Sequence, residues 1–201
     1  MIPHATLWLF AVALGTLAAI ARARNRTVTF RRTSVVALTL AALAMIVVGE
    51  EREAPVAVGV ALVLACVIVC AATDLATGLI FDVVTAASIL MILLYASATR
   101  SLTTSVLGAC VCAGSLLALY VASRKRGIGF GDVKLGAVIG AGCGAELGIG
   151  AIGSAFVVGA LWAAPLLLSR RVLASDRVVF APCLALGTLG FLAFASLRGH
   201  G

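Results

Sequence analysis

Apolar segments of membrane-spanning length recur along the whole chain, and short stretches between them hold most of the charged and turn-forming residues. A helix needs about 20 apolar residues to cross the hydrocarbon of a bilayer. Hydrophobic residues make up 63% of the chain and charged residues 11%, a balance far outside that of soluble proteins. The segments are too long for barrel strands and lack their alternating polarity. We therefore predict an all-α, polytopic membrane protein.

The charged and turn-forming residues divide the chain into eight candidate transmembrane helices. Nothing like an Ala-x-Ala cleavage site closes the first segment, so we interpret it as a span rather than a signal peptide. The sixth segment is short and rich in glycine. We expect an N-terminal helix pair at 1–54 and a membrane domain at 55–201. The predicted spans are 3–21, 33–49, 55–73, 83–98, 102–122, 132–145, 148–168 and 179–197.

The distribution of Lys and Arg orients these segments, because cytoplasmic loops collect positive charge. Twelve of the fifteen basic residues fall at 22–32, 124–134 and 170–177, which the eight-helix count places on one side. The opposite side receives the acidic turn at 50–53 and Glu146. We therefore predict that both termini lie outside. The same clusters account for the net charge of +7, so we do not expect nucleic-acid binding.

The six cysteines all lie within apolar segments and form no CxxC pair. This pattern favours small hydrophobic core residues over a zinc site or a disulfide framework. We expect no metal and no cofactor.

Three of the eight acidic residues, Asp74, Asp82 and Asp132, fall on the predicted cytoplasmic side near helix boundaries. Each also has a structural interpretation. Asp74 could be an interfacial residue that ends a helix, and Asp132, after the glycines of "GIGFG", could cap the next one. Lys134 is either a positive charge close to Asp132 or one of the basic residues that set the orientation of the chain in the membrane. We favour the second interpretation. Asp176 lies among arginines and is interpreted as a solvated charge partner.

The alternative interpretation pairs Asp74 with Asp132, which the topology puts at the same membrane face. Two carboxylates a few ångströms apart cannot easily both ionise, so they would share a proton. One would act as a base on water while its protonated partner polarises a scissile carbonyl. The sequence alone does not show that the two side chains meet.

Three motifs resemble those of the type IV prepilin peptidase family, the membrane-embedded GxGD aspartyl proteases. "DLATGLIFDVVT", residues 74–85, resembles the pattern D-x-x-x-x-x-I-P-[DN]-x-x-T, and "GFGDVKL", residues 129–135, resembles the G-x-G-D-x-K box. "VVFAPCLALG", residues 178–187, is similar to the I-P-F-G-P-F-L-A-L-G segment that opens the last helix. The order and separation of the motifs make the set specific over residues 55–197.

The resemblance implies that Asp74 and Asp132 are the catalytic pair and that Gly129 and Gly131 permit close packing around a peptide. Asp82 would support or cap the site, with Lys134 beside it. The chain departs from the pattern at Phe81, Val179, Ala181 and Cys183, which changes local turn geometry rather than the acid pair. The family's cysteine-rich methyltransferase domain has no counterpart, so we expect cleavage without N-methylation.

The implied substrate is a prepilin or pseudopilin, whose basic leader is removed at the cytoplasmic face of a bacterial inner membrane. The partners would then be this peptide and the lipid bilayer, and the sequence does not predict an oligomeric state. Two other functions stay open at this point. One is a small transporter or channel with interfacial carboxylates, and the other is a non-catalytic membrane scaffold.

Overall fold

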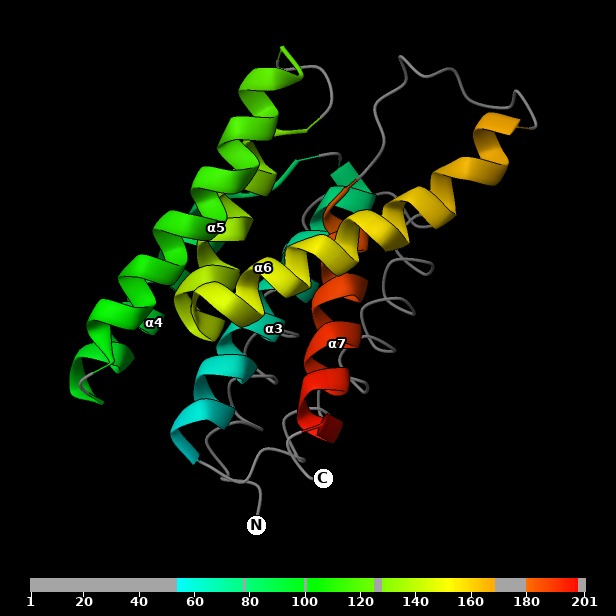
Figure 1. Cartoon of the computed structure of the whole chain (residues 1–201). Helices are drawn as coiled ribbons and strands as arrows, with labels where there is room; N and C mark the ends of the chain where they lie inside the picture. The colour runs from blue at the N-terminus through cyan, green and yellow to red at the C-terminus, as the bar shows by residue number, and fades with distance from the viewer. Residues whose placement is uncertain (1–53, 78, 100, 125–127, 169–179, 199–201) are drawn as a thin grey trace.

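The computed structural model describes residues 54–77, 79–99, 101–124, 128–168 and 180–198 (Figure 1). Within these ranges the regular structure is entirely helical, as predicted. Three helices, α3, α5 and α6, contain stretches long and apolar enough to cross a membrane, and α4 and α7 are shorter apolar helices. The helices are α3 (Ala54–Thr77), α4 (Asp82–Ala98), α5 (Leu102–Ala122), α6 (Phe130–Leu168) and α7 (Ala181–Arg198).

The helix boundaries agree closely with the sequence prediction. The segments predicted at 55–73, 83–98, 102–122 and 179–197 correspond to α3, α4, α5 and α7, and the two at 132–145 and 148–168 lie in α6. The segments at 3–21 and 33–49 lie outside the described residues. The count of eight spans, the location of both termini and the division at residue 54 therefore stay predictions.

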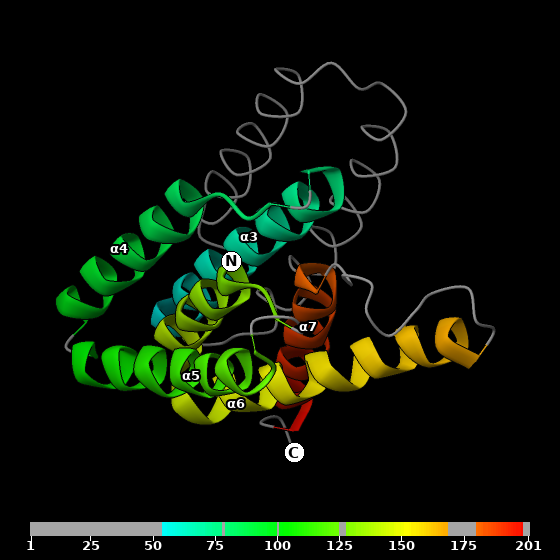
Figure 2. The ribbon, with the colours of Figure 1, turned by 90° about the horizontal axis from the view of Figure 1, so that it is seen from above.

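Helix α6 consists of two arms that meet at Gly144, whose φ of 80° and ψ of 177° are not helical. This positive φ is a conformation that glycine adopts at little cost. A Cβ placed on Gly148 would lie 3.2 Å from the Cα of Gly140, although residues eight apart in a straight helix are about 12 Å apart. The second arm therefore turns sharply away from the first, as Figures 1 and 2 show.

Helices α5 and α6 approach each other closely through glycine. A Cβ on Gly140 would collide with the backbone carbonyl of Gly108, and one on Gly108 would collide with the carbonyl of Gly140. Further along the same contact, Gly136 leaves room for the side chain of Leu116. Small residues are the usual means of packing helices in lipid, where no hydrophobic effect drives them together.

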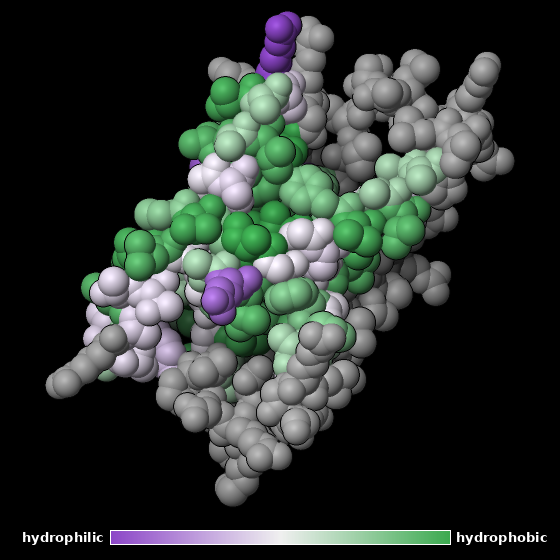
Figure 3. Space-filling view, in the orientation of Figure 1, coloured by the Kyte–Doolittle hydropathy of each residue, from purple (hydrophilic) through white to green (hydrophobic). Residues whose placement is uncertain are grey.

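Among the described helices, α3 has the most deeply buried apolar span. It packs against α4, α6 and α7, and most of its apolar span is buried within the protein. The outward surfaces of the other helices are apolar as well, with Val83, Leu161 and Trp162 among the most exposed side chains. Figure 3 shows one such face, which is largely hydrophobic over α5 and α6. Such a surface suits contact with lipid chains.

The cysteines divide into two groups. Cys66, Cys70, Cys112 and Cys183 are buried as predicted, whereas Cys143 is half-buried and Cys110 is exposed on α5. Cys110 therefore corrects the interpretation of all six as buried core residues. Lipid chains and a protein core are similarly apolar surroundings for a thiol. The apolar character of a segment therefore does not show which side of the helix is covered by neighbouring helices.

The close contact of α5 with α6 leads to a stability prediction. Gly140→Ala should lower the free energy of unfolding by about 1–3 kcal/mol, because the added methyl group meets backbone that cannot rotate away. Gly153→Ala is the matched control on the same helix, since a Cβ there meets nothing within 4 Å. Thermal unfolding in detergent micelles measures both variants. Identical melting curves for Gly140→Ala and the wild type would contradict the packing described here.

Candidate functional site

The C-terminal end of α3 and the N-terminal ends of α4, α6 and α7 meet in one region. Three contacts join them. Ile80, between α3 and α4, packs on Gly131 of α6. Asp82 of α4 pairs with Lys134 of α6, and Asp74 of α3 accepts a hydrogen bond from the start of α7. Figure 2 shows α4 leaving the end of α3 through the short connection that holds Ile80.

Asp132 lies in the first turn of α6 and is 5% exposed. Its Oδ2 accepts the backbone N–H of Gly129 at 3.0 Å, and its own N–H donates to the carbonyl of Gly129 at 3.1 Å. This is the arrangement by which a third-position carboxylate satisfies a free amide at a helix start. Asp132 thus caps α6 as predicted, although it lies within the first turn of the helix. The capping hydrogen bond uses Oδ2 only, and Oδ1 is buried without a hydrogen-bond partner.

Asp74 lies near the end of α3 and is half-buried. The helix continues to Thr77, so Asp74 belongs to α3 rather than following it as predicted. Its Oδ2 accepts a long hydrogen bond, 3.4 Å, from the N–H of Ala181. Ala181 is the first residue of α7, and Pro182 follows it at a position where the missing N–H of proline costs no helical hydrogen bond. The carboxylate of Asp74 therefore faces a helix N-terminus, which favours negative charge.

Asp74 and Asp132 belong to the same junction of helix ends, and the charge of Asp74 acts on the carboxylate of Asp132. Cys70, one turn before Asp74 on α3, and Cys183, in the first turn of α7, also lie within electrostatic range of Asp132. The surroundings of the pair are thus formed by small thiols and helix ends.

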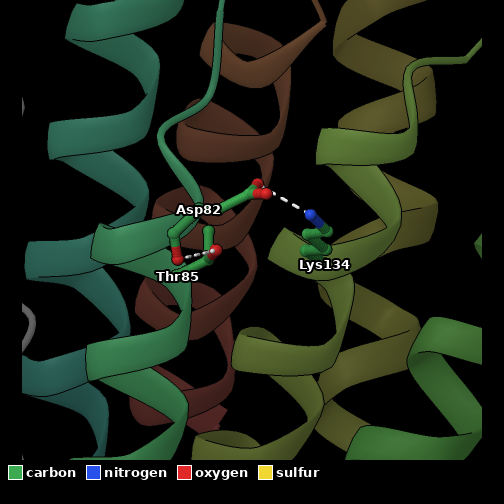
Figure 4. A network of polar contacts seen from close by, with 3 residues as sticks. All are labelled: Asp82, Thr85 and Lys134. Carbon is green, nitrogen blue, oxygen red and sulfur yellow. Dashed lines mark hydrogen bonds and ion pairs between the residues drawn. The ribbon is translucent and has the colours of Figure 1, made fainter.

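A second polar contact joins the two motifs beside the acid pair (Figure 4). Asp82 Oδ1 lies 2.7 Å from Lys134 Nζ, with Asp82 72% exposed and Lys134 31% exposed. The Thr85 hydroxyl donates to the backbone carbonyl of Asp82 at 3.1 Å and Thr85 itself is buried. The ammonium of Lys134 also lies 5.1 Å from the ring centre of Phe130. Lys134 therefore has a defined partner, and its contribution to membrane topology stays a prediction.

Glycine is favoured at positions 129 and 131 of the second motif for two different structural reasons. A Cβ on Gly131 would lie 3.0 Å from both the Cβ and the Cδ1 of Ile80, so this position lets α6 begin directly against the connection from α3 to α4. Gly129 supplies the amide that Asp132 accepts, and a Cβ there would lie 3.2 Å from the acceptor oxygen. Both glycines thus allow close approach at the start of α6.

All six predicted site residues lie in this region, and two contributions were not predicted. Ile80 sits in the first motif, yet its contact with Gly131 crosses between motifs and no local pattern reveals it. The amide of Ala181 comes from the third motif, whose presence was noted without a role. Within the described residues, no group of three or more His, Cys, Asp or Glu is arranged to hold a metal ion.

The arrangement has a definite chemical capacity. Two carboxyl groups at one junction, one of them with an oxygen that has no hydrogen-bond partner, are the kind of groups that serve acid–base chemistry. Their position near helix ends, rather than mid-span, puts them where a peptide could arrive from the membrane surface.

Comparison with known proteins agrees with this site. No curated protein and no solved structure matches the chain. The sequence model of the type IV leader peptidase family matches residues 61–164, about half of the chain, and this range includes both Asp74 and Asp132. The chain is a helical membrane protein that belongs to the type IV leader peptidase family.

Proposed function

We propose that the protein is an aspartyl endopeptidase in which Asp74 and Asp132 form the catalytic pair. The observation that carries the proposal is that both acids lie at one junction of helix ends, although they come from separate motifs: Asp74 accepts the first amide of α7, and the turn that holds Asp132 packs on Ile80 after α3. The unpartnered Oδ1 of Asp132 supports it further, because a buried carboxylate oxygen without a donor is costly unless it serves a water or a substrate.

In the proposed reaction one carboxylate removes a proton from a water molecule, and the water oxygen attacks the scissile carbonyl carbon. The protonated partner donates a hydrogen bond to the carbonyl oxygen, which gains negative charge as the tetrahedral intermediate forms. Collapse of the intermediate breaks the C–N bond, and the proton passes to the leaving amine. The two groups exchange roles, so the chemistry needs no metal ion.

We infer that the substrate is a prepilin or pseudopilin, cut between its basic leader and its apolar helix at the cytoplasmic face. The substrate helix would lie in the bilayer against the apolar outer surface of the enzyme, and the leader would reach the membrane surface beside the acid pair. The clustering of Lys and Arg supports this orientation. The end-of-helix positions of both acids favour this function over transport, for which midplane sites are typical.

Removing either carboxylate should abolish leader removal. Asp74→Asn and Asp132→Asn should each lower the rate at least 100-fold, because a carboxamide cannot act as a general base or general acid near neutral pH. Glu146→Gln is the matched control, since Glu146 is an exposed acid beyond the bend of α6. Gel analysis of a co-expressed prepilin in membranes reports the cleavage.

The same variants distinguish a catalytic role from a structural one. Asp132→Asn should melt at a temperature no lower than the wild type, because a neutral amide is less costly to bury than a carboxylate with an unpaired oxygen. Cleavage that survives either substitution, or a loss of activity that follows a loss of folded protein, would contradict the proposal.

The proposed mechanism also predicts how cleavage depends on pH and on metal. The rate should follow a bell-shaped curve, since one carboxyl must be protonated and the other ionised. Excess EDTA should leave the rate at the optimum unchanged. Purified enzyme in micelles with a synthetic prepilin peptide measures both effects. A rate that rises to a plateau with pH, or that EDTA removes and zinc restores, would exclude a two-carboxylate mechanism.

A further inference from the structure

We propose that the ion pair of Asp82 with Lys134 is a positioning device that holds Asp132 in register with Asp74. This inference rests on the proposed function, and it gives both residues a role that is neither catalytic nor a matter of membrane topology. It starts from the distance of 2.7 Å between Asp82 Oδ1 and Lys134 Nζ, which joins the first turn of α4 to the beginning of α6 (Figure 4).

The two acids of the catalytic pair belong to different helices and are far apart in sequence. Asp74 is carried by the end of α3, and the connection 79–81 leads from there to α4. Asp132 is carried by the first turn of α6. The connection and α4 are joined to that turn by the contact of Ile80 with Gly131 and by the ion pair of Asp82 with Lys134. The first is a van der Waals contact that can slide, whereas the second is a directed bond between charged groups.

Lys134 acts on Asp132 through the backbone rather than through its charge. Residues two apart in a helix point to different sides, and Asp132 is buried while Lys134 is partly exposed toward Asp82. The ammonium therefore faces Asp82 and the ring of Phe130, not the acid pair. Its effect on Asp132 is to fix where the first turn of α6 lies.

Both ends of the ion pair are themselves held in place. The backbone carbonyl of Asp82 accepts the hydroxyl of the buried Thr85, which secures the first turn of α4. The ammonium of Lys134 lies over the ring of Phe130, which limits its rotamers. Because the ammonium and the backbone of Asp82 are positioned in advance, less conformational entropy opposes the pairing.

An exposed ion pair usually contributes little to folding stability. Catalysis is far more sensitive to geometry, since a displacement of about 1 Å at a reacting group can lower a rate about 100-fold. A positioning device at this place should therefore have a small effect on melting temperature and a large effect on kcat. This contrast separates positioning from a merely structural role.

The test measures leader removal by purified enzyme in micelles, together with thermal unfolding. Lys134→Met and Asp82→Ala should each lower kcat about 10- to 100-fold with KM within about twofold, and the double variant should be no slower than the slower single variant. Asp82→Asn keeps an oxygen that accepts from the ammonium, so it should retain most of the rate. Exchanging the charges, Asp82→Lys with Lys134→Asp, should recover part of the lost rate, because the combined side-chain length is unchanged.

Two control variants distinguish failure of the positioning inference from failure of the proposed function. Arg124→Met removes a cation at the end of α5 and should leave kcat unchanged, whereas Asp132→Asn should abolish cleavage. If Asp132→Asn is inactive while Lys134→Met cleaves at the wild-type rate, the positioning inference alone fails. If Asp132→Asn remains active, the proposed function fails and the inference with it. Additive losses in the double variant, or losses that only follow the melting temperature, would also overturn the positioning role.

Discussion

The buried carboxylate of Asp132 imposes the main constraint on this structure. A charge-bearing group that is buried inside a helical membrane protein must be compensated, because burial removes most of its contact with solvent. The compensation comes from helix ends: Gly129 gives its free amide to Asp132, and Ala181 gives its amide to Asp74. Helix beginnings offer such donors, since the first amides of a helix have no partner within it whereas amides in helix interiors are already bonded. The acids and the helix ends must therefore occupy the same place.

Bringing four helix ends together requires close approach elsewhere in the bundle. The first arm of α6 lies against α5 with backbone touching backbone at Gly108 and Gly140. The bend at Gly144 then lets the second arm leave in another direction and pack along α7, where Ser154 donates to the carbonyl of Gly187 at 2.7 Å. One helix thus contacts both α5, on one side of the site, and α7, whose first amide faces Asp74. The glycines of α6 are the reason that this is sterically possible.

The family and the site together give a consistent picture of a membrane peptidase. The family match covers the part of the chain from the middle of α3 to the second arm of α6. Within it, the first motif supplies Asp74 and the second supplies Asp132, while Ile80 and the pair of Asp82 with Lys134 join the two motifs in space. The third motif lies beyond the match and contributes the amide of Ala181. Each motif thus contributes a different kind of interaction to one junction.

The sequence by itself determined the helical class, the approximate helix boundaries and the acidic residues of interest. The reason is that these depend on local properties, namely the length of apolar runs and the charged and turn-forming residues that interrupt them. Only the tertiary structure decided that α3 has the most buried apolar span of the described helices, that Cys110 is exposed and that Lys134 pairs with Asp82. A residue that faces lipid and one that faces a neighbouring helix can be equally apolar, so hydrophobicity does not reveal which surfaces meet. Contacts such as Ile80 on Gly131 depend on that choice of neighbours, which no local stretch of the chain records.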